Sequence, residues 1–245
     1  MTSFPSLCWR ISSNPHERHD PTMRSQFFNN LEQGQQLPGH FALQNSKMLR
    51  VHLNGDVLAR QGSMVAFQGQ MEFDYEGAGG IGKFMKKALT GEGVPLMRVK
   101  GQGLLFAAND ADDIHLFYLE NEGLTVNGKN ILAYDSHLQS DIQRVQGAGI
   151  AAGGLFNTTL TGTGWVALTT HGTPVMLDCG RAPTFADGQS AVAWSTSLQV
   201  GVNRTMKAGA LIGRGSGEAM QLAYQGQGFV LIQASEGPTV APHTH

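Results

Sequence analysis

Polar and apolar residues alternate along much of this chain with the two-residue period of a β-strand. In SMVAFQGQMEFDY, residues 63–75, one face holds Val65, Phe67, Met71, Phe73 and Tyr75, and the other face is mostly polar. Because successive side chains of a strand point to opposite faces, this alternation predicts a half-buried strand. LMRVKGQGLLFAA, residues 96–108, continues the pattern and predicts another strand.

A helical period occurs in one short stretch. GKFMKKAL, residues 82–89, places Phe84, Met85 and Leu89 on one side, which predicts a helix of about two turns. We therefore expect an all-β protein with short helical segments between its hairpins.

Two sequence motifs recur along the chain. LTGEGVPLMRVKGQGLLF, from Leu89, aligns with LTGTGWVALTTHGTPVML, from Leu160, and GRGSGEAMQLAYQGQGFVL, residues 213–231, is a looser third copy. The second motif occurs as NGDVLARQGSMVA (54–66), NGKNILAYDSHLQ (127–139) and DGQSAVAWSTSLQ (187–199). The first alignment superposes three pairs of glycines, Gly91 on Gly162, Gly93 on Gly164 and Gly101 on Gly172.

The recurrence predicts one β domain of three imperfect repeats over residues 41–235. The units span about 41–108, 117–179 and 180–233, and each buries its apolar face against its neighbours. We interpret the recurring glycines as hairpin residues, because tight turns often need a positive φ. Residues 1–40 are expected to form a disordered leader and residues 236–245 a disordered tail.

Composition supports strands and turns over helices. Charged residues make up 15% of the chain, against a usual quarter, and there are 32 glycines. The formal net charge of −2 gives no bulk attraction for a polyanion, so nucleic acid is not an expected partner. One local basic cluster remains, which we interpret as a solvated face: Lys83, Lys86, Lys87, Arg98 and Lys100.

Residues that could carry chemistry are scattered. His115, His137 and His171 are far apart in sequence, unlike the paired ligands of a metal site, and no Gly-x-Ser-x-Gly nucleophile motif occurs. NDADD, residues 109–113, is interpreted as an exposed turn and GRGSGE, residues 213–218, as a hairpin. Cys179 is expected in the core. We therefore predict no enzymatic activity, no metal and no cofactor.

Two tryptophans, Trp165 and Trp194, lie with Tyr134 on equivalent or near-equivalent strands of the repeats. Exposed aromatic rings can stack on nucleic-acid bases, whereas buried ones contribute to packing, which is the simpler interpretation here. If they are exposed, these two rings and the five basic residues form a candidate surface for a small ligand or single-stranded RNA.

The chain resembles one known family in NGDVLARQGSMVAFQGQMEF, in LTGEG followed by GQGLLFAA, and in GSGEAMQLAYQGQGFVLIQASE. This is the altered-inheritance-of-mitochondria protein twenty-four family, and the resemblance covers about residues 41–235. It implies repeated β-sandwich units of the double-stranded β-helix type, a fold related to the tryptophan RNA-binding attenuation protein, often assembled into oligomers. The mitochondrial relative is associated with inner-membrane organisation. The family has no accepted catalytic residues, and the ligand-contact residues of the attenuation protein have no matching motif in this chain.

These observations lead us to expect a non-enzymatic structural or interaction protein that acts through self-assembly as a homo-oligomer. The chain has two cysteines, and Cys8 lies in the expected leader, which argues against a structural disulfide and favours a reducing, cytoplasmic location. Two alternatives stay open. One is a binding module for a small ligand or single-stranded RNA, and the other is a peripheral membrane protein whose helix at 82–89 lies on anionic lipid.

Overall fold

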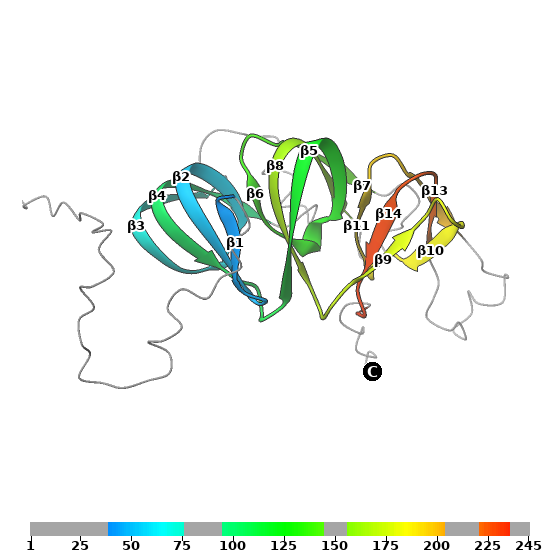
Figure 1. Ribbon diagram of the computed structural model, residues 1–245, viewed down its shortest axis with the longest axis horizontal. Coiled ribbons are helices and arrows are strands. Elements are labelled where there is room, and N and C mark those ends of the chain that lie inside the picture. Colours follow the sequence, from blue (N-terminus) through cyan, green and yellow to red (C-terminus); the bar gives the residue numbers. More distant parts are fainter. Residues whose placement is uncertain (1–38, 76–94, 145–155, 204–220, 236–245) are drawn as a thin grey trace, which may run out of the picture. The chain divides into compact units, whose positions relative to one another are not determined.

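The computed structural model describes residues 39–75, 95–144, 156–203 and 221–235, which all belong to one compact unit of the chain, Gly34–His245. These residues form strands and one 3₁₀ turn, η2 (Figure 1). In chain order the elements are β1 (Phe41–Asn45), β2 (Met48–Arg60), β3 (Met64–Tyr75), β4 (Leu96–Ala107), β5 (Asp113–Asn127), η2 (Gly128–Asn130), β6 (Ile131–Asp135), β7 (Gln139–Arg144), β8 (Phe156–Thr170), β9 (Val175–Asp178), β10 (Thr184–Asp187), β11 (Ala191–Ser195), β12 (Gln199–Asn203), β13 (Gln221–Gln225) and β14 (Phe229–Ile232).

Antiparallel pairing joins these strands into two sheets. The larger has the order β3-β4-β2-β6-β8-β5-β11-β14-β9, with β1 beside β2 and β7 beside β8. The smaller has the order β10-β13-β12. The predicted all-β class is therefore confirmed.

The expected helical segments between hairpins are not found in the described part of the chain. Its one helical element is η2, three residues long, in which the side chain of Asn127 accepts a hydrogen bond from the backbone N–H of Lys129. The helix predicted at 82–89, the leader before residue 39 and the tail after residue 235 lie outside the described residues.

The interpretation of the glycines as hairpin residues is right for some of them and wrong for others. Gly172 and Gly226 lie in bends between strands and have positive φ. Gly101, Gly162 and Gly164, by contrast, lie inside β4 and β8. The strands in this protein are longer than the sequence pattern suggested, and glycines occur where they bend.

Two of the long strands change neighbours at a glycine. β8 pairs with β7 up to Thr161 and with β6 from Val166 onwards, and between them Gly162 has a φ of +126°. β2 pairs with β1 up to Val51 and with β6 from Val57, and between them Gly55 has a φ of +134°. A residue with a side chain rarely adopts this φ. Glycine therefore lets each half of the strand align with a different partner.

β3 and β4 approach each other closely where both bend. A Cβ atom on Gly103 would lie 1.9 Å from the carbonyl oxygen of Gln68, and one on Gly69 would lie 2.3 Å from that of Gln102. The bend brings the rings of Phe67 and Phe73 to a centroid distance of 5.3 Å, although six residues of straight strand span about 20 Å. The glycines thus allow the sheet to curl over its own apolar face.

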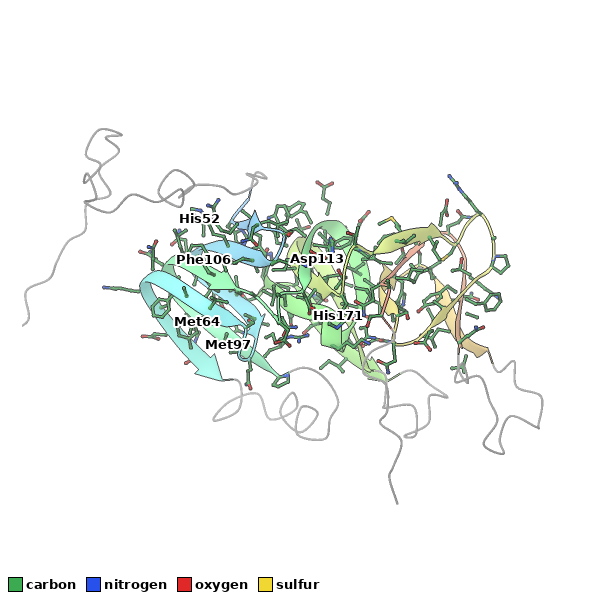
Figure 2. The ribbon with its side chains drawn as sticks, turned by 90° about the horizontal axis from the view of Figure 1, so that it is seen from below. His52, Met64, Met97, Phe106, Asp113 and His171 are labelled. Atoms are coloured by element: carbon green, nitrogen blue, oxygen red, sulfur yellow. The ribbon has the colours of Figure 1, made fainter. Side chains whose placement is uncertain are left out.

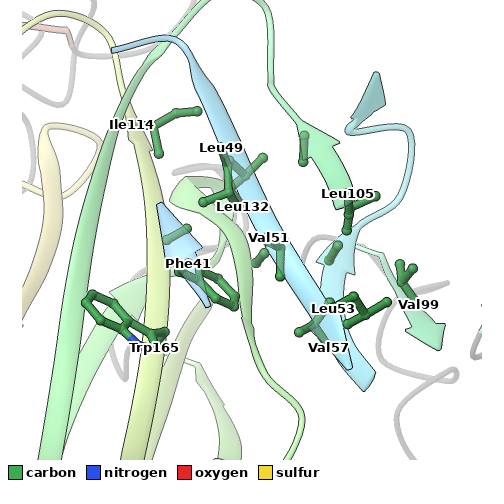
Figure 3. Packing of buried hydrophobic residues seen from close by; sticks show 14 of the residues in the cluster. Phe41, Leu49, Val51, Leu53, Val57, Val99, Leu105, Ile114, Leu132 and Trp165 are labelled. Atoms are coloured by element: carbon green, nitrogen blue, oxygen red, sulfur yellow. The ribbon is translucent and has the colours of Figure 1, made fainter. Parts of the chain in front are cut away.

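Three clusters of buried apolar residues form the core. The buried residues of the first come from β1, β2, β4, β5, β6 and β8, and in it the ring of Phe41 stacks on that of Trp165 at a centroid distance of 6.5 Å (Figure 3). Although centred on the first predicted unit, this cluster takes Trp165 from the second. The second cluster includes Leu58 from the first unit and Val192 from the third. Each of these two clusters therefore contains residues from more than one predicted unit. The division of the chain into three repeat units stays a prediction.

Replacing Gly103 by alanine should destabilise the fold strongly. The added Cβ would overlap a backbone oxygen that cannot move freely, at a φ of +142°, so we expect a loss of at least about 3 kcal/mol in the free energy of unfolding. Gly201 of β12 is the matched control, because a Cβ there meets nothing within 4 Å. Gly201→Ala should change stability by less than about 0.5 kcal/mol. Urea unfolding of both variants checks this, and equal losses would contradict the account.

Replacing Tyr224 by phenylalanine should stabilise the protein. Tyr224 is fully buried in the third cluster, and its hydroxyl has no hydrogen-bond partner among the described residues. Removing an unpaired buried hydroxyl should therefore gain about 1 kcal/mol. Burial also raises the pKa of Tyr224 far above its ordinary value.

This raised pKa makes the stability depend on pH. Above about pH 10 the unfolded chain loses the tyrosine proton while the folded chain keeps it, so wild-type stability should fall as pH rises. Tyr224→Phe should lack that part of the loss. Denaturant melts at neutral pH and above pH 10 test both effects, and a variant that is less stable than wild type at both would contradict them.

Candidate functional site

The strand β3 is an open edge of the larger sheet. It pairs with β4 along one side, and no strand in the described part of the chain pairs with its other side. An edge strand presents unpaired backbone N–H and C=O groups that can accept another strand. At twelve residues, β3 is long for an exposed edge, which natural proteins usually shorten or charge.

The side chains of β3 are more exposed than the sequence pattern predicted. Phe67 pairs in register with Leu105, which pairs with the buried Val51, so Phe67 faces the core of the first cluster. Even so, Phe67 is 43% exposed and Val65 is 54% exposed. The strand is confirmed, but its alternation is interrupted by a register shift between Met64 and Ala66, which places Met64 and not Val65 opposite the buried Ala107. Burial of Val65 and Phe67 is wrong, because Val65 lies at this irregularity and no further strand of the described residues covers this end of the core.

We call Met64, Val65 and Phe67 the β3 patch. Figure 2 labels Met64 at the beginning of the strand. The half-buried Met71 and Phe73 extend the same apolar surface along β3. Other exposed apolar side chains occur on the short strands β9, β10 and β12, in smaller groups: Val175 and Met176, Phe185, and Val200. The β3 patch therefore combines the longest exposed edge with the largest of these groups.

Two pairs of opposite charge lie on the outer face of this sheet. Arg98 contacts Asp56, and the Lys100 Nζ atom lies 2.6 Å from the Asp74 Oδ2 atom. Burial alone would raise the pKa of Asp56, but hydrogen bonds from Arg98 and Ser136 outweigh it and hold this pKa below its ordinary value. The hydrogen bond to Asp74 raises the pKa of Lys100. Arg98 and Lys100, two residues of the predicted ligand surface, thus belong to a face that carries both positive and negative charges.

The remaining residues of the predicted ligand surface are not brought together here. Lys83, Lys86 and Lys87 lie outside the described residues. Trp165 and Trp194 are buried in different clusters, and the ring of Trp165 is covered by Phe41 and Tyr118. Their burial supports packing over base stacking.

Metal-binding and reactive side chains are dispersed in the described ranges. No group of three His, Cys, Asp or Glu side chains there could hold a metal ion. His171 contacts Asp112 at 2.8 Å, and Cys179 is buried in the core as predicted. The NDADD segment does form a turn, but Asp112 within it is buried and not exposed as expected.

No helix of the described part of the chain has the length and apolar character needed to cross a bilayer. This finding comes from the strand-rich residues that the structure describes.

Comparisons with known proteins give a family and a fold. The model of a family described as mitochondrial biogenesis AIM24 matches residues 41–235. A crystal structure of a Streptococcus pyogenes protein is similar to this chain with a TM-score of 0.62 and 22% sequence identity, covering 82% of this chain and 91% of that one. At this identity the likeness shows the fold alone. No curated protein matches the chain.

Proposed function

The chain belongs to the mitochondrial biogenesis AIM24 family, and we propose that it is a non-enzymatic interaction protein that acts by assembling with copies of itself. The observation that carries this proposal is the β3 patch on a long open edge. Strand pairing at this edge supplies backbone hydrogen bonds, and burial of the patch supplies the hydrophobic stabilisation.

The sequence of β3 suits pairing with a second copy of the same strand. In an antiparallel, two-fold arrangement centred on Gln70, Phe67 of one copy lies opposite Phe73 of the other, and aromatic cross-strand pairs stabilise sheets. Glu72 then lies opposite Gln68, and Asp74 lies opposite Ala66, so like charges do not meet. The acidic residue Asp74 is also already paired with Lys100 on β4.

A second copy would bury apolar side chains that the first cluster leaves exposed at β3, and this burial would stabilise the assembly. The residues that form this core are buried, whereas Phe73, packed against it, is partly buried and Phe67, on the same face of β3, is 43% exposed. A partner strand beside β3 extends the sheet by one position and covers them. A reducing, cytoplasmic location is part of the proposal, and the buried thiol of Cys179 is compatible with it.

The assembly should be lost when a charge is placed in the β3 patch. We expect the wild-type chain to form a discrete oligomer and Val65→Lys to be a monomer, because an ammonium group on an edge strand opposes strand pairing. Light scattering coupled to size exclusion measures the mass. Val200→Lys on β12 places the same charge at another exposed valine on a strand of the smaller sheet and should leave the mass unchanged.

A variant of β9, the strand at the other edge of the larger sheet, tests whether assembly uses β3. Val175 on β9 is 55% exposed, nearly the same as Val65, so Val175→Lys tests whether any charged edge has the same effect. A monomeric wild-type chain, or an oligomer that Val175→Lys dissociates and Val65→Lys does not, would refute assembly through β3. Circular dichroism of each variant shows whether the fold is kept.

A further inference from the structure

An open cleft of about 880 Å³ lies in the middle of the larger sheet, away from the β3 patch. Its walls come from β5, β7 and β8, from the residues that follow β11, and from β14. Its volume is within the range of small-molecule sites. The cleft is a separate surface from the proposed assembly edge, because none of its lining residues belongs to β3.

The cleft exists because β5 and β11 separate at this point. Their pairing ends at Leu124 and Ser195. β5 then bulges at Asn121, which has a φ of +57° and shifts the register against β8. A bulge redirects side chains and is common beside binding sites. Gly123 has no side chain to fill the gap, and a Cβ there would lie 2.6 Å from the Thr196 Oγ1 atom.

Two polar side chains on one face of the sheet line this cleft and have no side-chain hydrogen bond among the described residues. Gln139 pairs in register with Thr161, and Thr161 pairs with Gly123, so the three share one face of the sheet. No side-chain hydrogen bond of Gln139, Thr161 or Glu122 occurs within the described ranges. Gln139 and Thr161 together provide a neutral amide and a hydroxyl on this face, hence both donors and acceptors. Glu122 pairs with Gly162, so its side chain belongs to the opposite face of β5.

His137 adds a defined acceptor to this wall. Its Nε2 atom lies 2.7 Å from the backbone carbonyl oxygen of Thr163. A carbonyl oxygen only accepts hydrogen bonds, so Nε2 must carry the proton and donate it. In the neutral ring, the Nδ1 atom is then left as an acceptor for another group.

Aromatic rings line the same cleft. Phe117 and Phe229 are partly buried there, and Tyr118 is 48% exposed, with its ring 5.0 Å from that of Trp165. Packing against Trp165 fixes the position of the Tyr118 ring, so it offers a pre-positioned apolar contact. The cleft thus combines aromatic surface with unpaired neutral polar groups.

The charge of the lining limits the class of ligand. Among the residues that the structure describes, the lining includes no lysine or arginine, and Glu122 is its one carboxylate. A phosphate or sulfate group would therefore meet a negative charge with no cation to balance it. A ligand with many hydroxyl groups can both donate to and accept from the amide, the hydroxyl and His137, and its C–H faces can contact aromatic rings.

We propose that this cleft binds a neutral oligosaccharide, with Gln139, Thr161 and His137 bonding its hydroxyl groups and Tyr118 contacting a sugar ring. The two sides of the site suit the two sides of a pyranose, one rich in hydroxyls and one apolar.

Isothermal titration calorimetry on the full-length chain tests the proposal with maltohexaose, cellohexaose and N-acetylated chitohexaose as neutral probes, and with spermine as a cationic probe. We expect at least one neutral probe to bind and spermine not to bind. Gln139→Ala and the nearly isosteric Thr161→Val should each weaken that binding by about fivefold, since each removes one hydrogen bond. Glu122→Gln and added salt should have little effect, because the ligand carries no charge.

Gln225→Ala is the matched control, because Gln225 is an exposed glutamine on β13 outside the cleft. It should bind the probe as the wild-type chain does, and thermal melts of all variants verify that they are folded. Absence of binding by all three neutral probes overturns the proposal. So does binding of spermine that Glu122→Gln abolishes, or equal weakening by Gln139→Ala and Gln225→Ala. Because Val65→Lys does not touch the cleft, its binding should be unchanged whatever its oligomeric state.

Discussion

The structure depends on a backbone constraint in its long strands, which must bend in the middle while their hydrogen bonds to a neighbour continue. In β2, β4 and β8 the bend occurs at glycines with positive φ, and in β5 it occurs at Asn121. Each half of β2 and β8 then meets a different partner, so a single chain of pairings joins the first described strand to the last. In the curl of β3 and β4, the same glycines also remove the Cβ atoms that would prevent close approach.

The two surfaces to which we assign roles follow from this way of building a sheet. A sheet that curls over its apolar face but does not close leaves an edge, and at β3 that edge exposes part of the first core cluster. A strand that bulges leaves a gap beside its neighbour, and at Asn121 that gap is the central cleft. The first surface is apolar and suits another protein strand. The second is polar and aromatic and suits a small neutral ligand.

Much of the fold could be predicted from the sequence, and the functional surfaces could not. The alternation in residues 63–75 is a local property, and it correctly predicted a strand and its core-facing side from Phe67 onwards, but not the register shift at Val65. Whether that strand lies at an edge depends on which other strands pair with it, so the exposure of Val65 and Phe67 was not visible. The roles of Gly101 and Gly162 were misjudged for a similar reason, since a positive φ is needed both in a turn and in a bent strand. Gln139, Thr161 and Glu122 come together only through pairing of distant strands, and no spacing in the sequence indicates it. The recurring motif contains Gln139, which aligns with Gln199. However, the motif gave no reason to connect Gln139 with β5.

Hydrogen–deuterium exchange of the β3 amides at high and low protein concentration tests most directly whether the open edge is where this protein acts. If copies assemble through β3, the amides of residues 64–75 should exchange more slowly at high concentration, because the edge N–H groups then donate to a partner strand. The amides of β9, at the other end of the sheet, should exchange at the same rate at both concentrations. Exchange in β3 that is independent of concentration, or protection that occurs at β9 instead, would contradict the account.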